Sequence, residues 1–396
     1  MSEIREFRID VADEALEDLK DRLRRTRWPE AEMPDAAAAQ PTAVRDAGSG
    51  TWAQGLPLEY AKELRDYWLE EYDWAARQAY FNRFPQGVTK IDGLDIHFIH
   101  VKSESPDAAP LLITHGWPGS VVEFHKIIEP LTDPAAHGGD AADAFHVVCP
   151  SLPGYGFSAK PAATGWGVGR IAEAWDVLMG RLGYDRYFAQ GGDWGAAVTT
   201  QIGIQDKGRC AGIHVNMPTS GPTKEARENP TERDRQAFNG GRYYNAWGAG
   251  YSKQQSTRPQ TLGYGLVDSP MGQATWVIEK FWEWMDCGNH PENTLTREEL
   301  LDNVMFYWWN GNGASSGRLY WESFNRAFGG DQPKVEVPTG CSIFPKEIVP
   351  TPRSWAEQRY GNIVYWNELD RGGHFAAFEQ PELFVEELRR CFRLMR

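Results

Sequence analysis

From residue 89 onward, short apolar strands alternate with helical segments, and this alternation limits the possible folds more than any other feature of the sequence. Strands are predicted at residues 94–101, 110–115, 145–151, 187–191 and 211–216. Helical segments, such as the one predicted at residues 169–182, lie between several of them. Because strands that alternate with helices are typical of a mainly parallel sheet, the sequence predicts an α/β fold.

The alternation stops near residue 219 and resumes near residue 335. The stretch between them is rich in Trp, Tyr, Gln, Asn and Gly, and we expect it to form several helices and no strands. Two more strands are predicted at residues 335–344 and 362–369, followed by an amphipathic helix over 381–395. One sheet split by a helical insertion explains this order better than two domains in tandem.

The first 88 residues carry helical patterns. Leu16, Leu19 and Leu23 fall at helical spacing, and residues 60–81 are predicted to form a second helix with aromatic side chains over much of its surface. Because so much aromatic surface needs something to pack on, we expect an extension that wraps the core or a second subunit. A homodimer is the expected assembly.

These patterns divide the chain into four predicted parts. They are an N-terminal helical and meander extension over residues 1–88, a first part of the core over 89–218, a helical lid over 219–333 and a second part of the core over 334–396. A chain of 396 residues can bury a large core without disulfide or metal staples.

Composition excludes several classes of function. The net charge of −14, without a long run of Lys or Arg, argues against nucleic-acid binding. The five cysteines are scattered without the C-x-x-C spacing of zinc or redox sites, and the chemistry inferred below implies no metal and no organic cofactor. The charged N-terminus and the lack of an apolar run of about 20 residues predict a cytoplasmic protein that makes no membrane contact. A small molecule is the expected partner.

The segment Gly191-Gly192-Asp193-Trp194-Gly195 lies between a predicted strand and a predicted helix. Glycine two residues before and two residues after a reactive side chain is the pattern of a nucleophile elbow. A helix-capping aspartate is the alternative interpretation. We favour the elbow because a doubly wound sheet binds its ligands at the carboxyl ends of its strands. The sequence therefore predicts Asp193 as a carboxylate nucleophile.

A second turn, His115-Gly116-Trp117-Pro118-Gly119, ends another predicted strand. Such a turn can hold the backbone N–H of Trp117 towards the elbow. With the N–H of Trp194, the residue after the nucleophile, it is expected to form an oxyanion hole with two donors.

A carboxylate nucleophile forms an alkyl ester, and a base must then activate water to hydrolyse that ester. His374 lies in a loop after the last predicted strand and before the last helix, and it fits this role better than the other histidines. Glu347 directly follows a predicted strand and is the expected acid partner of His374. The competing acids are Asp331, Glu336, Glu357 and Asp370.

Together these segments resemble the epoxide hydrolases of the α/β-hydrolase superfamily, in the branch that contains the microsomal and juvenile-hormone enzymes. The likeness covers nearly the whole chain. It includes Arg25-Thr26-Arg27-Trp28-Pro29, His115-Gly116-Trp117-Pro118-Gly119-Ser120, Pro153-Gly154-Tyr155-Gly156-Phe157-Ser158, the elbow, and Arg371-Gly372-Gly373-His374-Phe375-Ala376-Ala377-Phe378-Glu379.

The resemblance implies an α/β-hydrolase fold and an enzyme that opens a small apolar epoxide with water to give a vicinal diol, in detoxification of foreign compounds. It implies the roles already assigned to Asp193, His374 and Glu347. It adds two lid tyrosines, at positions that look like Tyr251 and Tyr320, which hydrogen-bond the epoxide oxygen and protonate it. Vertebrate microsomal members carry an N-terminal membrane anchor, whereas this sequence begins directly with the extension, so we do not expect membrane association.

Three other functions fit parts of the pattern. A haloalkane dehalogenase shares the aspartate nucleophile and the histidine, and Trp194 would suit a halide, but the lid tyrosines argue against it. A ligand-binding homologue without activity would need no complete triad. A serine esterase is disfavoured because the elbow holds aspartate.

Overall fold

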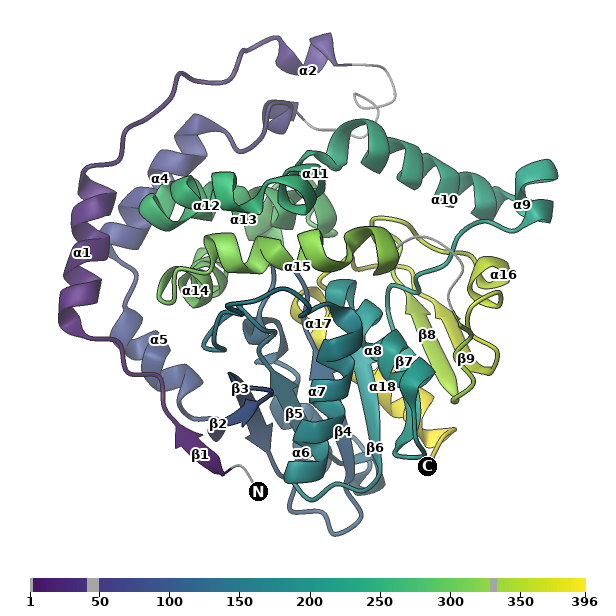
Figure 1. Cartoon of the computed structure of the whole chain (residues 1–396). Helices are drawn as coiled ribbons and strands as arrows, with labels where there is room; N and C mark the ends of the chain where they lie inside the picture. Colours follow the sequence, from purple (N-terminus) through teal and green to yellow (C-terminus); the bar gives the residue numbers. More distant parts are fainter. Residues whose placement is uncertain (1–2, 41–49, 328–332) are drawn as a thin grey trace.

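The computed structural model describes residues 3–40, 50–327 and 333–396, and its centre is one sheet (Figure 1). The strands are β1 (Ile4–Phe7), β2 (Gln86–Ile91), β3 (Leu94–Val101), β4 (Ala109–Thr114), β5 (Phe145–Pro150), β6 (Tyr187–Gly191), β7 (Cys210–Val215), β8 (Thr339–Ile343) and β9 (Ile363–Glu368). Their order in the sheet is β1-β2-β3-β5-β4-β6-β7-β8-β9. The first four strands in that order pair antiparallel and the remaining pairs are parallel. The predicted α/β fold is confirmed.

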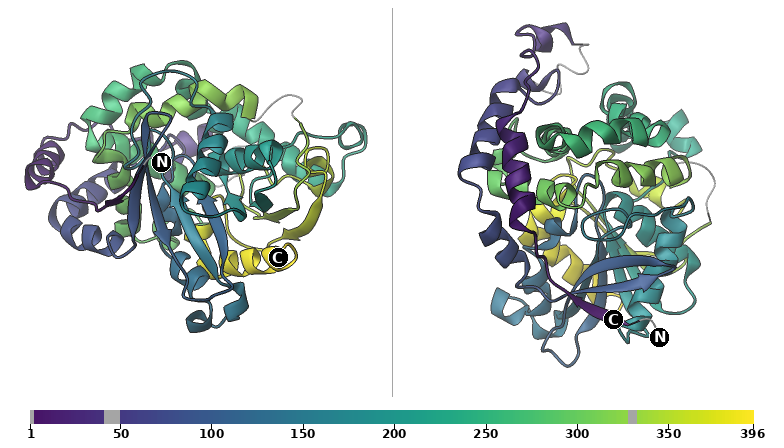
Figure 2. Two further views of the ribbon diagram at one scale, coloured as in Figure 1. Left: turned by 60° about the horizontal axis from the view of Figure 1, so that its bottom comes forward. Right: turned by 60° about the vertical axis from the view of Figure 1, so that its left-hand side comes forward.

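Helices cover both faces of this sheet (Figure 2). On one face lie α7 (Val168–Arg181) and α8 (Asp193–Gln205), which pack against each other. The amphipathic helix α18 (Pro381–Arg393) lies on the other face, where Phe384, Leu388 and Phe392 are buried. The shorter helices of the core are α6 (Ile128–Thr132), α16 (Arg353–Ala356) and α17 (Ala376–Glu379). The helices predicted at residues 169–182 and 381–395 are therefore confirmed within two residues at each end.

Between β7 and β8 the described chain forms helices and no strands. They are α9 (Lys224–Glu228), α10 (Glu232–Tyr243), α11 (Gly250–Thr257), α12 (Pro259–Asp268), α13 (Pro270–Trp284), α14 (Arg297–Trp308) and α15 (Gly313–Ala327). Local signals start several of them, since Thr231 and Thr296 form capping boxes and proline opens α12 and α13. The lid predicted over 219–333 also includes residues 328–332, which lie outside the described residues.

Two details of the sheet differ from the prediction. The extension contributes β1, and β2 begins at Gln86, so the sheet starts before residue 89. Strand β1 could not be predicted because its four residues, Ile4-Arg5-Glu6-Phe7, are mostly exposed and only weakly apolar. Strand β8 is shorter than the predicted 335–344, and Val335 makes only an isolated bridge to Tyr360.

The predicted helix over residues 60–81 is two helices, α4 (Leu58–Glu70) and α5 (Trp74–Phe81). Asp73 separates them, because its side chain accepts a hydrogen bond from the N–H of Ala76 and thereby caps α5. The other helices of the extension are α1 (Asp13–Arg24) and the four-residue α2 (Ala36–Ala39).

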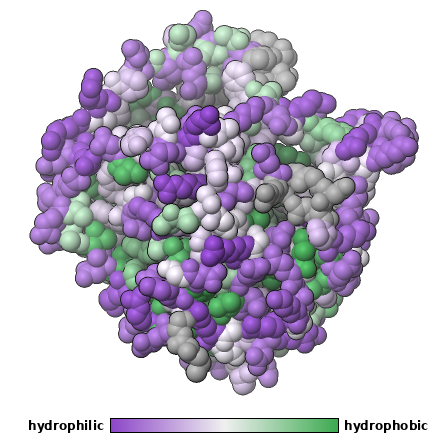
Figure 3. Space-filling model, in the orientation of Figure 1, coloured by the Kyte–Doolittle hydropathy of each residue, from purple (hydrophilic) through white to green (hydrophobic). Residues whose placement is uncertain are grey.

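The helices of the extension lie beside the lid of the same chain (Figure 1), and aromatic side chains join the two. Trp52 stacks on Trp282 of α13 with ring centroids 4.9 Å apart, and Trp74 of α5 packs against Trp309, 5.2 Å away, just after α14. The predicted wrapping is thus made within one chain. The homodimer stays a prediction, and on the face drawn in Figure 3 apolar residues form separate patches in a mostly polar surface.

No described helix is both long enough and apolar enough to cross a bilayer. Within the same residues, no group of three or more His, Cys, Asp or Glu side chains is arranged to hold a metal ion.

Candidate active site

Asp193 lies in a sharp turn between β6 and α8. Its φ of 49° falls in the left-handed region, which costs a residue with a side chain free energy. A Cβ at Gly191 would collide with the backbone of Gly195, and a Cβ at Gly195 would collide with the carbonyl group of Thr114. Only glycine fits at these two positions, which explains the spacing seen in the sequence.

The two carboxylate oxygens of Asp193 face different groups. The backbone N–H of Trp117 donates a hydrogen bond to Oδ1 at 2.7 Å. His374 Nε2 lies 3.4 Å from Oδ2. The N–H of Trp194 stays the predicted second donor of the oxyanion hole. One oxygen is therefore held by the turn after β4, and the other lies beside an imidazole.

His374 is held between two carboxylates. Its Nδ1 lies 2.7 Å from Oε1 of Glu347, and its backbone N–H donates to the carbonyl of Trp284 at 3.0 Å. Both side chains of the His374–Glu347 pair are almost completely buried. Burial alone would lower the pKa of His374, but the charge of Glu347 and the hydrogen bonds to Asp193 and Glu347 raise that pKa well above its usual range.

The other acids considered as partners of His374 either have different neighbours or lie outside the described residues. Glu357 pairs with Arg353, and Asp370 pairs with Arg371. Glu336 lies beside Gly361. Asp331 lies outside the described residues.

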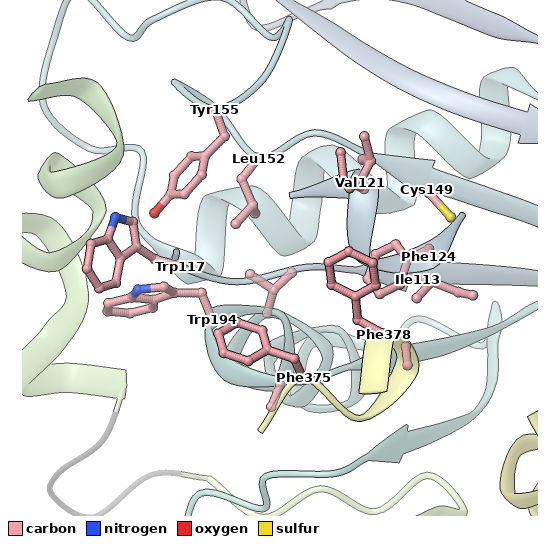
Figure 4. Close-up of a cluster of buried hydrophobic side chains, with 14 of the residues drawn as sticks. Ile113, Trp117, Val121, Phe124, Cys149, Leu152, Tyr155, Trp194, Phe375 and Phe378 are labelled. Atoms are coloured by element: carbon pink, nitrogen blue, oxygen red, sulfur yellow. The ribbon is translucent and has the colours of Figure 1, made fainter. Parts of the chain in front are cut away.

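Tyr251 of α11 and Tyr320 of α15 reach the site from the lid, with only 5% and 2% of their surface exposed. Tyr251 stacks on the indole of Trp117 at 4.8 Å, and Tyr320 packs edge-on against Trp194, also at 4.8 Å. Figure 4 shows both indoles extending from the buried cluster towards the lid. Among the described residues, the Tyr320 hydroxyl makes no well-formed hydrogen bond, and the group it interacts with is the hydroxyl of Tyr251. A buried donor without a well-formed hydrogen bond is costly for folding and suits a group that binds substrate.

Burial raises the pKa of both tyrosines well above the usual value, and the charge of Asp193 raises it further. Both hydroxyls are therefore protonated at neutral pH. The two rings lie 5.7 Å apart. The lid thus presents two neutral O–H donors next to a carboxylate.

Two residues of the site were missed in the sequence. Glu123 lines a cavity of about 20 Å³ together with Asp193 and His374, which is room for about one water molecule. Its place in the apolar run Val121-Val122-Glu123-Phe124 was the available signal. Tyr244 hydrogen-bonds the hydroxyl of Tyr251, and nothing in the sequence distinguished it from Tyr243.

Comparisons of sequence point to one group of enzymes. A profile described as "Epoxide hydrolase N terminus" matches residues 4–124, and one described as "alpha/beta hydrolase fold" matches residues 109–246. A protein of Stigmatella aurantiaca with a provisional epoxide hydrolase name is 50% identical over 98% of this chain and 85% of its own length. Epoxide hydrolase 1 of Oryctolagus cuniculus is 36% identical over 97% of this chain and 88% of its own.

Solved structures agree with the sequence comparisons. The epoxide hydrolase of Aspergillus niger matches all of this chain and 97% of its own, with a TM-score of 0.85 and 31% identity. The juvenile hormone epoxide hydrolase of the silkworm Bombyx mori matches all of this chain and 95% of its own, with a TM-score of 0.82 and 31% identity. Both similarities include the extension and the lid as well as the core.

Proposed function

This chain belongs to the epoxide hydrolase family, and from that premise we propose that it opens an apolar epoxide through a covalent ester on Asp193. The observation that carries this mechanism is the position of His374, with Nε2 3.4 Å from Asp193 and Nδ1 2.7 Å from Glu347. An imidazole so placed can serve a second, hydrolytic step, while the ionised carboxylate can attack without a base.

In the first step, a carboxylate oxygen of Asp193 attacks one carbon of the oxirane ring. The bond between that carbon and the ring oxygen breaks, and the oxygen takes a proton from Tyr251 or Tyr320. This help is needed because an alkoxide is a poor leaving group even in a strained ring. The products are a hydroxyalkyl ester of Asp193 and one tyrosinate.

The ester removes the negative charge of Asp193 that favoured the protonated imidazole, so in the second step neutral His374 takes a proton from water while the water oxygen attacks the carboxyl carbon of Asp193. The N–H groups of Trp117 and Trp194 stabilise the oxyanion. The tetrahedral intermediate then expels the diol oxygen, which takes the proton back from His374. The carboxyl group of Asp193 is left with one extra proton, which equals the proton that the tyrosinate has lost.

We propose that the substrate is apolar because aromatic rings surround the two lid tyrosines that would bind it. Trp117, Trp194 and Trp284 pack around Tyr251 and Tyr320. Dehalogenase chemistry on the same scaffold would not need the two lid hydroxyls. A variant with both Tyr251→Phe and Tyr320→Phe should therefore lose epoxide opening, whereas a dehalogenase would continue to turn over haloalkanes.

The ester itself can be trapped. The variant His374→Gln should form the ester at Asp193 and fail to hydrolyse it, so that intact-protein mass spectrometry finds a gain equal to the mass of an added aryl epoxide. His100→Gln is the matched control, because His100 lies on β3 and bonds Tyr184 at 2.9 Å. It should turn over with no adduct. Absence of an adduct in His374→Gln would overturn the assignment of the base.

Labelled water tests the nucleophile independently. Repeated turnover of the parent enzyme in water containing heavy oxygen should place the label in the carboxylate of Asp193, since the water attacks that carboxyl carbon. A peptide that stays unlabelled would mean that water attacks the epoxide directly. A cytoplasmic location, a role in detoxification and a dimeric state are proposed on the sequence arguments alone.

A further inference from the structure

Tyr251 has a hydrogen-bond neighbour that the two-step mechanism does not use. The hydroxyl oxygens of Tyr251 and Tyr244 lie 3.2 Å apart. The Tyr244 oxygen is also 3.1 Å from Oγ of Ser252, whose own O–H donates to the carbonyl of Ala249 at 2.9 Å. Tyr244 therefore has one proton and two oxygen acceptors within reach.

This proton count gives the network two arrangements. If Tyr244 donates to Ser252, its oxygen can accept a hydrogen bond from Tyr251. When Tyr251 instead donates to an epoxide oxygen, its own oxygen is free to accept from Tyr244. A hydrogen bond donated to a phenol oxygen favours the phenolate, so the second arrangement makes Tyr251 a stronger acid.

The backbone sets Tyr244 in this position. Residues Tyr244–Gly248 form one turn of π-helix between α10 and α11, closed by a 2.7 Å bond from the N–H of Ala249 to the carbonyl of Tyr244. Single π-helical turns are rare and are frequent at functional sites. The rings of Tyr244 and Tyr251 meet at 76° with centroids 6.4 Å apart.

Tyr244 also lies between the buried site and solvent. It lines an open groove of about 670 Å³ together with Glu347 and Trp284. Tyr251, by contrast, is 5% exposed and Tyr320 is 2% exposed. Tyr244 thus joins the buried tyrosine to a surface that water can reach.

We propose that Tyr244 is a positioning residue for ring opening. It donates a hydrogen bond to Tyr251 while the epoxide oxygen takes the Tyr251 proton. Afterwards Tyr244 passes a proton from the groove back to Tyr251. This inference rests on the proposed function. The O–H bond of Tyr251 breaks as the alkoxide O–H bond forms. The Tyr251 phenolate then takes the Tyr244 proton, and Tyr244 takes a proton from water in the groove. That last proton balances the one released by the regenerated carboxyl group of Asp193.

The charged groups around Tyr244 are compatible with this role. Burial raises its pKa, while the hydrogen bonds to Ser252 and Tyr251 oppose that shift. Among the charges, Asp193 raises the pKa and Lys280 lowers it. Tyr244 is therefore protonated at the start of each turnover.

The test measures ring opening alone, in the His374→Gln background where the ester accumulates. Adding Tyr244→Phe should slow ester formation roughly tenfold or more, because a hydrogen bond to a developing charge is lost. The loss should grow for epoxides whose alkoxide is more basic, with little change in substrate affinity. In the parent background, the tyrosinate absorbance should persist longer after each turnover.

Tyr243→Phe is the matched control. It removes a neighbouring hydroxyl that bonds Glu283 at 3.3 Å and belongs to a residue lining the same groove, whereas the hydrogen bond to Tyr251 comes from Tyr244. It should leave the rate of ester formation and its dependence on the alkoxide unchanged. Ser252→Ala removes the competing acceptor, so its ester should form at least as fast as in the parent.

The outcomes separate the two proposals. Ester formation in the Tyr244→Phe variant at the parent rate, with the same tyrosinate lifetime, would overturn the role of Tyr244 and leave the two-step mechanism standing. Equal slowing by Tyr243→Phe would also overturn it, since a general disturbance of the lid would then be the cause. If His374→Gln alone forms no ester, the proposed function itself fails.

Discussion

Glu123 is a carboxyl group buried beside a second carboxyl and an imidazole. Burial, together with the charges of Asp193 and Glu379, raises its pKa to about 8 against the opposing charge of His374. Glu123 is therefore mostly protonated at pH 7 in the folded protein, whereas it is ionised in the unfolded chain. Between about pH 4.5 and pH 8 the folded state holds a proton that the unfolded state has released.

It follows that this residue makes the protein less stable as pH rises through that window. The slope for one group is up to about 1.4 kcal/mol of unfolding free energy per pH unit. Glu123→Gln should flatten the fall in stability between pH 5 and pH 8, measured by urea unfolding. Glu123→Asp keeps a titrating group and should keep the slope. Parallel curves for Glu123→Gln and the parent would contradict the assignment.

Tyr320 gives a prediction in which stability and activity separate. Its buried hydroxyl makes no well-formed hydrogen bond among the described residues, so Tyr320→Phe should leave the melting temperature unchanged or higher. Ester formation should nevertheless fall roughly tenfold or more, because one donor to the epoxide oxygen is lost. Calorimetry and single-turnover kinetics on the same samples make the measurement.

Tyr360→Phe is the control, for which we expect lower stability and unchanged activity. The Tyr360 hydroxyl bonds Thr200 at 2.9 Å and accepts from the N–H of Thr219 at 3.2 Å, away from the site. This variant should lose about 1 kcal/mol of stability and keep its rate of ester formation. If Tyr320→Phe loses as much stability as Tyr360→Phe, the Tyr320 hydroxyl has a structural partner after all.

At the scale of elements, one buried ion pair fastens the extension to the lid. Arg77 of α5 makes hydrogen bonds at 3.0 Å to both carboxylate oxygens of Asp302 on α14, and Tyr72 donates to the same carboxylate at 2.8 Å. Burial nevertheless raises the pKa of Asp302 to about 6. The carboxylate therefore depends on Arg77 for its charge.

Arg77→Leu should leave the Asp302 carboxylate buried without a counter-ion, at a cost of about 3–5 kcal/mol in unfolding free energy. Arg22→Leu is the control, because Arg22 of α1 pairs with an exposed Asp268 at the end of α12 and should cost less than about 1 kcal/mol. Thermal unfolding compares the two. Similar losses would show that the buried pair does not hold α5 to α14.

Some elements could be predicted because their signals are local. Strands β3 and β6 begin and end where their apolar residues do, at the predicted bounds. The break between α4 and α5 was missed because the apolar residues continue across it, and one capping side chain decides it. Strand β1 was missed because pairing with β2 creates it, and no pattern in its four residues shows that partner.

For the whole molecule, the order of motifs along the chain located the candidate site. Asp193, Glu347 and His374 each follow a strand in the parallel part of the sheet, so their meeting at one edge could be expected. Glu123 and Tyr244 could not be found in this way, since their importance depends on burial and on a contact between neighbouring turns of the lid. Local sequence patterns therefore indicate the site residues that follow strands, but not the residues that join the site only through tertiary contacts.

The position of β1 has a consequence for how the protein is made. This strand forms one edge of the sheet and pairs with β2, and the extension that follows it packs on the lid, where Arg77 of α5 bonds Asp302 of α14. During synthesis, α5 therefore has no α14 to pack on until the residues up to Asp302, 225 positions after Arg77, have been made. A chaperone that binds apolar segments of a nascent chain would find the aromatic side chains of the extension exposed during this interval.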